Sequence, residues 1–288
     1  MSVTQDYQLQ FGDTGQLLNS DAIDAINPFF DLSKITGLDT PDYRYDVRQT
    51  TGGDGGSVNV EFVDTRTIVV EGTAYGPATN LHQYLEQLKT DYRPSNVNKP
   101  FYFFTPGFGQ RVIFAKSLGI KYDWDMAMRT GQTPIQIQLI AEDPVIYGDI
   151  MSMSTGLASG GAGYAFSKSF PYGYTATTGS NSINAANSGN APVGAIVSFY
   201  NVLNPTVVND NVGAGLQLNV AVADGEWYEL GLKQRSVRLN GLTNRRNFLD
   251  NASRWFMLQP GDNQLRFLGT PNGSGTPTMT VVYRSGSY

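Results

Sequence analysis

Short segments in which apolar and polar residues alternate recur along the whole chain of 288 residues. Residues 135–139 read Ile-Gln-Ile-Gln-Leu, and residues 58–62 and 67–71 alternate in a similar way. A period of two turns every second side chain to the same face, as in a half-buried β-strand. The polar residues 64–66 between the last two segments predict a hairpin. The sequence therefore predicts a mainly all-β fold class.

One segment has helical spacing instead. Its apolar residues fall at i, i+3, i+4, i+7 and i+11, namely Leu81, Tyr84, Leu85, Leu88 and Tyr92. This spacing predicts one α-helix over about residues 80–92, with Asn80 and Gln83 as a capping box and Pro94 ending it. A single amphipathic helix beside many strands is expected to lie against a sheet.

The distribution of charge divides the chain in two. Residues 150–209 carry one formal charge, Lys168, and include a Gly/Ser-rich segment at 154–163. Such composition is typical of a domain junction followed by polar loops and edge strands. Glu142-Asp143-Pro144 comes just before it, so we expect an N-terminal domain over 1–149 and a C-terminal domain over 150–288.

Strands spaced evenly after residue 190 predict a β-sandwich for the second domain. Asn204-Pro205 is expected to end the first strand, and residues 223–225 to turn one strand into the next. Asn240-Gly241 is a strong hairpin signal, and the turn at 259–262 predicts another hairpin. The expected strands are 193–200, 216–222, 226–230, 236–239, 254–258, 263–267 and 278–283.

Composition excludes several kinds of site. The chain has no cysteine and a single histidine, His82, which is expected on the helix surface. Thiolate metal sites and two-histidine zinc sites are therefore excluded, and a Ser-His-Asp relay would need His82. A net charge of −5 without a Lys/Arg-rich run disfavours direct nucleic-acid recognition and binding to an anionic membrane. Residues 1–6 lack signal-peptide features and no long apolar run occurs, so synthesis in the cytoplasm is expected.

The remaining candidate sites favour structural roles, and we expect no catalytic, cofactor-binding or metal-binding residues. The carboxylate pairs Asp123/Asp125 and Glu226/Glu229 are close in sequence, whereas a glycosidase needs two carboxyl groups across a sugar-sized gap. The glycines of residues 52–56 precede a strand and indicate a turn rather than a phosphate cradle, and residues 209–211 favour an Asx turn over a calcium site. Burial is favoured for Trp255, because apolar residues flank it on both faces.

The order of several C-terminal motifs resembles the siphophage-type distal tail proteins. These motifs are Val237-Arg238-Leu239-Asn240-Gly241, then residues 253–263 with Trp255-Phe256 and Pro260-Gly261, then Thr280 to Arg284. The N-terminal half also fits, with Asp46-Val47-Arg48, glycines around Asp54, the strand at 66–72 and the single helix. The resemblance covers residues 40–145 and 190–285.

The resemblance implies a structural protein of the virion tail tip, made in the cytoplasm of the host bacterium. An N-terminal β-barrel or sandwich-like domain would form a hexameric ring, and a galectin-like β-sandwich would follow it. Implied partners are further copies of the chain, the tail tube protein and the baseplate hub or tail-associated protein, with tape measure and receptor-binding proteins as further candidates. We expect Leu81, Tyr84, Leu85 and Leu88, with the strands at 58–72, to form or support the contact between copies.

Two other functions remain open at this point. The first is a carbohydrate-binding host-adhesion module, which would stack sugars on Trp227, Tyr228 or Trp255. No histidine lies after His82, so the sugar-binding residues of true galectins are not supported. The second is a glycan hydrolase using Glu226 or Glu229, which requires a cleft with opposed carboxyl groups.

Overall fold

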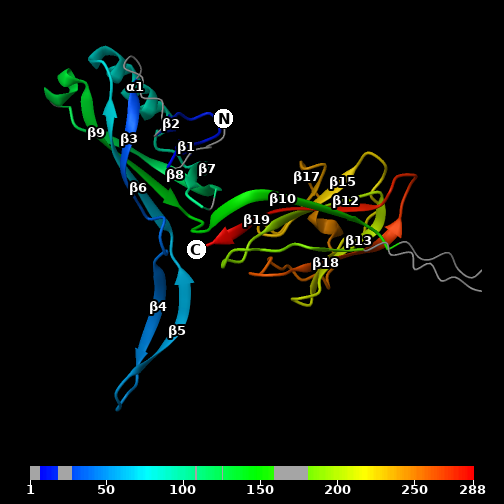
Figure 1. Cartoon of the computed structure of the whole chain (residues 1–288). Helices are drawn as coiled ribbons and strands as arrows, with labels where there is room; N and C mark the ends of the chain where they lie inside the picture. The colour runs from blue at the N-terminus through cyan, green and yellow to red at the C-terminus, as the bar shows by residue number, and fades with distance from the viewer. Residues whose placement is uncertain (1–6, 19–27, 108, 125, 159–180) are drawn as a thin grey trace, which may run out of the picture. The chain divides into compact units, whose positions relative to one another are not determined.

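The computed structural model describes residues 7–18, 28–107, 109–124, 126–158 and 181–288. The chain forms two compact units, Met1–Gly148 with Ser287–Tyr288, and Asp149–Gly286 (Figure 1). Expectations for residues 1–6, Asp125, Lys168 and residues 159–163 of the Gly/Ser-rich segment lie outside the described residues.

The first unit contains the one α-helix of the described chain, and its strands form antiparallel pairs. Its elements are β1 (Leu9–Phe11), β2 (Leu17–Leu18), β3 (Phe29–Thr36), β4 (Tyr43–Gln49), β5 (Gly56–Val63), β6 (Arg66–Tyr75), α1 (Ala78–Asp91), β7 (Lys99–Thr105), β8 (Gly109–Tyr122), the 3-10 helix η1 (Met126–Thr130), β9 (Gln132–Ala141) and the start of β10 (Ile146–Gly156).

Strand β8 joins two sheets of the first unit. Its first half pairs with β7, from Thr105 opposite Gly109 to Lys99 opposite Ala115, and β7 pairs with β1. Its second half pairs with β9, which pairs with β6 and then β3. The second half contains a bulge between Ser117 and Gly119, and Gly119 has a φ of +118°, which an L-residue adopts with strain. A strand that bends at a bulge lets two sheets enclose one core.

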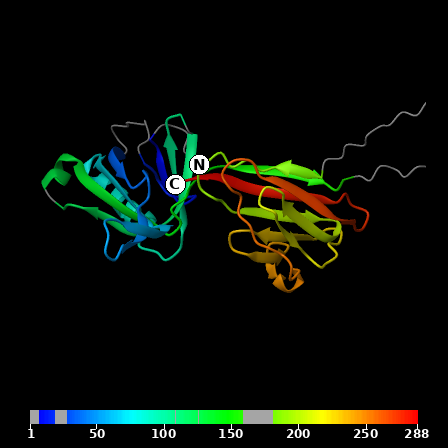
Figure 2. The ribbon, with the colours of Figure 1, turned by 90° about the horizontal axis from the view of Figure 1, so that it is seen from below.

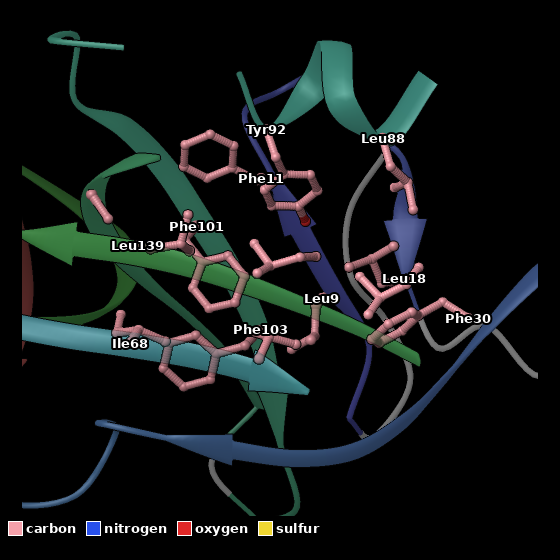
Figure 3. Close-up of a cluster of buried hydrophobic side chains, with 14 of the residues drawn as sticks. Leu9, Phe11, Leu18, Phe30, Ile68, Leu88, Tyr92, Phe101, Phe103 and Leu139 are labelled. Carbon is pink, nitrogen blue, oxygen red and sulfur yellow. The ribbon is translucent and has the colours of Figure 1, made fainter. Parts of the chain in front are cut away.

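The core of the first unit lies between these sheets and α1 (Figure 3). The expected alternation in β9 is confirmed, because Ile135, Ile137 and Leu139 are buried while the glutamines between them are half-buried. From the helix side, Tyr92 stacks on Phe11 with ring centroids 5.2 Å apart. Burial of these apolar side chains is the main stabilising term for the unit.

Two details of the first unit differ from expectation. Strand β5 pairs with β4 and not with β6, so residues 64 and 65 link two different sheets rather than forming a hairpin. The helix begins at Ala78 after Pro77, without a side-chain cap, so the expected capping box at Asn80 is wrong. A proline just before the first turn has a backbone φ that suits a helix start and needs no side-chain cap.

The second unit is a sandwich of two antiparallel sheets, as expected for the C-terminal domain. One sheet has the order β17-β16-β15-β12-β19-β10 and the other β11-β18-β13-β14. Figure 2 shows β10 and β19 side by side in the first of them. The further bounds are β11 (Ser182–Asn184), β12 (Ala195–Tyr200), β13 (Val202–Asn209), β14 (Ala214–Gln217), β15 (Trp227–Gly231), β16 (Ser236–Leu239), β17 (Thr243–Asn244), the 3-10 helix η2 (Arg246–Phe248), β18 (Gln264–Pro271) and β19 (Thr278–Ser287).

Aromatic side chains join the two sheets of the sandwich. Phe199 of β12 and Phe267 of β18 are both fully buried, and their rings stack with centroids 5.7 Å apart. The expected Asn240-Gly241 hairpin is confirmed, because β16 pairs with β17 and both turn residues have a positive φ.

Three expectations for the second unit are wrong. The chain turns at Asn201, and Asn204-Pro205 lies inside β13 as a bulge, where proline needs no ladder hydrogen bond. Residues 254–258 form no strand, since they bond to two separate segments, through Gly215 and Val193. Strands β14 and β15 belong to different sheets, so residues 223–225 connect the sheets.

Candidate assembly surfaces

The helix residues expected at a subunit contact lie in the core of the first unit. Leu81, Leu85 and Leu88 are fully buried, and Tyr84 is half-buried against the same cluster. Burial raises the pKa of the Tyr84 hydroxyl, and the nearby Asp91 carboxylate raises it further. The three leucines therefore hold α1 in place, and any contact that α1 itself makes with another copy must use residues on its outer face.

The outer face of α1 carries an aromatic contact and an ion pair. His82 is exposed, as expected, and its ring meets Trp124 edge-on with centroids 5.1 Å apart. Lys89 Nζ lies 2.6 Å from Glu86 Oε1 and 5.2 Å above the ring of Tyr122. Trp124 is 70% exposed, so an apolar side chain borders this face of the helix.

Strands β4 and β5 form a two-stranded sheet of their own, here called the ribbon (Figure 1). Tyr43 pairs with Val63 on one face, and Phe62 pairs with Arg44 on the other. Apolar side chains are exposed on both faces: Tyr43, Tyr45, Val47, Val58 and Phe62. An isolated two-stranded hairpin is marginally stable in water, so this sheet is expected to require a further partner.

Arg66 anchors the base of the ribbon. It starts β6, is 3% exposed, and donates from Nη1 to the carbonyl oxygens of Gly37 (2.9 Å) and Asp39, which precede β4. Its Nε donates to the carbonyl of Pro144 at 3.1 Å. Burial lowers the pKa of the guanidinium, with Asp39 opposing the effect. The arginine thus ties both strand connections of the ribbon to one point of the first unit.

A groove of about 520 Å³ lies elsewhere on the first unit. Edge strand β3 supplies Leu32 and Ile35 to it, and Leu38 follows them, while β1 and β7 supply Leu9 and Phe103. Asp31 and Lys34 add one charge of each sign. The groove is therefore mainly apolar at its floor with charged groups on β3.

The aromatic residues expected to stack sugars do not form one surface. Tyr228 is 4% exposed and packs edge-on against Phe248, so its ring is not available to a ligand. Trp227 is half-buried, stacks on Tyr200 with centroids 6.4 Å apart, and donates from Nε1 to Glu229 Oε1 at 3.0 Å. Trp255 is half-buried, while the neighbouring Phe256 is buried.

The other sequence candidates lie in turns. Residues 52–55 form the tip of the ribbon between β4 and β5. The Asn209 side chain accepts the backbone N–H of Asn211 at 3.1 Å, which is the expected Asx turn, and Asp210 pairs with Arg266 at 2.7 Å. Within the part of the chain that is described, no group of three or more His, Asp or Glu residues could hold a metal ion. No helix among those residues is long and apolar enough to cross a membrane.

Sequence reasoning missed β4 and its pairing with β5. The signal was present, because Tyr43, Tyr45 and Val47 alternate with Arg44, Asp46 and Arg48. No strand was predicted at this segment, so the ribbon and its exposed apolar side chains were not predicted.

A comparison with protein-family models agrees with the resemblance of the second unit to distal tail proteins. Residues 188–286 match the family model of the siphovirus-type tail component, C-terminal domain. No curated protein is significantly similar in sequence.

Solved structures extend the likeness to the whole chain. The Dit protein (gp 19.1) of SPP1, described as a paradigm of the hub adsorption apparatus in phages that infect Gram-positive bacteria, aligns with a TM-score of 0.68 at 15% identity, over 98% of this chain and 99% of that chain. A chain of the phage p2 baseplate in its activated conformation with Sr aligns with a TM-score of 0.57 at 11% identity, over 96% and 98% of the two chains. Residues 188–286 therefore match this C-terminal domain family, and the chain as a whole has the fold of the SPP1 Dit protein.

Proposed function

We propose that copies of this chain form a closed ring at the tip of a siphophage tail. The family that the sequence resembles forms rings of six subunits. The ring would connect the tail tube protein to the baseplate hub or tail-associated protein, and through it to tape measure and receptor-binding proteins. The proposal is for a structural role without catalysis. The family match and the structural likeness to baseplate chains support it.

The exposed apolar ribbon is the observation that most strongly supports a ring. A closed ring requires heterologous contacts, in which two different patches of each copy meet. The ribbon supplies one patch, with Phe62 at 62% and Tyr45 at 64% exposure. Covering these aromatic side chains would stabilise the contact by about 1 to 2 kcal/mol each.

The groove beside β3 is the candidate for the second patch. Its apolar floor suits aromatic side chains, and Asp31 and Lys34 can pair with Arg44, Arg48 or Asp46 of a neighbouring ribbon. Arg66 would hold the base of the ribbon to the rest of the first unit when the contact forms, because it fixes the chain on both sides of the ribbon. The leucines of α1 support the ring indirectly, by holding the first unit together.

Two measurements test this contact: the mass of the purified protein by light scattering, and the amount of the chain incorporated into tails from infected cells. The double variant Y45S/F62S should lose ring assembly and incorporation into tails, while each unit keeps its fold because both side chains are exposed. Val97→Ser is the matched control, since Val97 is 64% exposed outside the ribbon. Unchanged incorporation of Y45S/F62S would refute the ribbon contact.

A further inference from the structure

The second unit contains a basic segment that departs from the acidic balance of the chain. Between Leu230 and Leu249 lie Lys233, Arg235, Arg238, Arg245 and Arg246, without any Asp or Glu. The chain as a whole carries a net charge of −5. A local excess of guanidinium groups creates a positive potential that attracts anions.

The fold gathers three of these arginines around one concavity, here called the arginine pocket. Its volume is about 460 Å³, and β16, β17 and η2 position its walls. Arg235, Arg238 and Arg246 line it together with the polar side chains of Gln234, Ser236 and Asn244. This volume lies within the range of small-ligand sites, about 300 to 1,000 Å³.

The guanidinium groups of the arginine pocket are not neutralised within the described chain. Its lining contains no carboxylate. Arg235, Arg238 and Arg246 form no ion pair with any described residue, whereas Arg44, Arg48 and Arg266 each do. Arg238 reaches only the Gly241 carbonyl, at 3.5 Å.

One carboxylate lies opposite the arginine pocket in the strand register. Glu229 is paired with Arg238 across β15 and β16, and its Oε1 accepts the indole N–H of Trp227 at 3.0 Å. No ion pair joins Glu229 to the three arginines among the described residues, so their guanidinium groups keep donors for a ligand.

We propose that the arginine pocket binds an anionic polymer of sugar or polyol units, through its phosphate or carboxylate groups. The planar guanidinium group binds either group with two parallel hydrogen bonds. The hydroxyl and amide groups of Ser236, Gln234 and Asn244 suit the hydroxyls of such a polymer. Leu242 is 87% exposed at the pocket and offers an apolar contact to its carbon backbone. A concave polar pocket of this size favours a chain-like ligand over an acidic protein surface. This inference goes beyond the ring, which needs no ligand.

Calorimetric titration of the full chain tests the proposal with four probes: a glycerol-phosphate oligomer, an oligogalacturonate, a neutral maltooligosaccharide and poly-glutamate. The wild type should bind one or both carbohydrate anions and not the neutral sugar, and the preferred anion identifies phosphate or carboxylate as the recognised group. The variant R238Q/R246Q should bind about tenfold more weakly or worse. R93Q/R129Q removes the same charge from exposed positions of the first unit and should bind like the wild type.

Thermal unfolding of R238Q/R246Q should match that of the wild type, since both arginines are exposed. Three results would overturn the proposal. The first is undiminished binding by R238Q/R246Q, and the second is an equal loss in R93Q/R129Q, which would indicate general charge attraction. The third is absence of binding to both carbohydrate anions, or equally tight binding of poly-glutamate, which would point to an acidic protein as the occupant.

Discussion

The side-chain amide of Asn209 donates a hydrogen bond of 3.1 Å to Oδ1 of Asn263, and both residues are fully buried. Asn263 Oδ1 also accepts the backbone N–H of Gln259 at 2.9 Å, and its Nδ2 donates to the carbonyls of Gln259 and Gly261. One buried amide therefore closes the Pro-Gly turn and links it to the end of β13. Buried polar groups are stabilising only when their hydrogen bonds are satisfied in this way.

Replacing Asn263 with alanine should lower the free energy of unfolding of the second unit by about 2 to 3 kcal/mol. The variant loses the turn and leaves the buried Asn209 amide unpaired. Thermal unfolding followed by tryptophan fluorescence measures the effect. Asn251→Ala, at an exposed position, serves as the control and should change little. Equal stability of N263A and N251A would show that the buried amide contributes nothing.

Replacing Arg66 with methionine should destabilise the first unit by about 3 kcal/mol, since it removes the charged hydrogen bonds to the carbonyls of Gly37, Asp39 and Pro144. Arg66→Lys should recover only part of the loss, because one ammonium group cannot match the directions that the guanidinium fork serves. Hydrogen exchange of the amides in β6 and at the base of the ribbon reports the effect. Full rescue by lysine would show that charge alone matters at this position.

Leu85→Ala should cost about 3 kcal/mol of stability, because it leaves a cavity in a fully buried cluster. Leu85→Asp should unfold the first unit and abolish incorporation into tails, since an unpaired charge would enter the core. Gln87→Asp on the exposed face of the same helix is the matched control and should fold. Circular dichroism with limited proteolysis distinguishes these outcomes, and a folded L85D would place Leu85 outside the core.

Acidification should weaken the second unit through Asp224. The Ser274 hydroxyl and the backbone N–H groups of Ser274 and Gly275 bond to its carboxylate and lower its pKa. A lowered folded-state pKa stabilises the fold above the ordinary value near 3.9, and this contribution is lost as the pH falls through the folded-state pKa.

The comparison of wild type with Asp224→Asn tests this pH dependence. Melting curves from about pH 7 to pH 3 should show a less stable variant near neutrality and converging curves in acid. Asp54→Asn, in the tip of the ribbon, is the control and should run parallel to the wild type. A stability difference between D224N and wild type that is independent of pH would contradict the assignment.

Local patterns in the sequence were enough to predict several elements of the fold. The alternation in β9 gave its buried face, and the spacing of Leu81, Leu85 and Leu88 gave the helix and its buried side. The Asn240-Gly241 turn gave the β16–β17 hairpin. These signals succeed because they depend on the period of the backbone and on turn geometry, which are set by near neighbours.

Strand pairing was less predictable, because pairing depends on residues far apart in sequence. Residues 62 and 67 are close in the chain, yet β5 pairs with β4 and β6 pairs with β9. Residues 254–258 alternate in a way that suits a strand, but their hydrogen bonds go to separate segments. The carbohydrate-binding alternative requires exposed aromatic rings among Trp227, Tyr228 and Trp255, but Trp227 and Tyr228 are neighbours on one strand and face opposite sides of the sheet.

Counting the copies of this chain at the tip of intact tails, by electron microscopy with symmetry determined from the images, tests the structural role most directly. We expect several copies in a closed ring around the tail axis, with each ribbon against the neighbouring subunit. A single copy per tail, or a ring whose contacts leave Tyr45 and Phe62 in solvent, would contradict it.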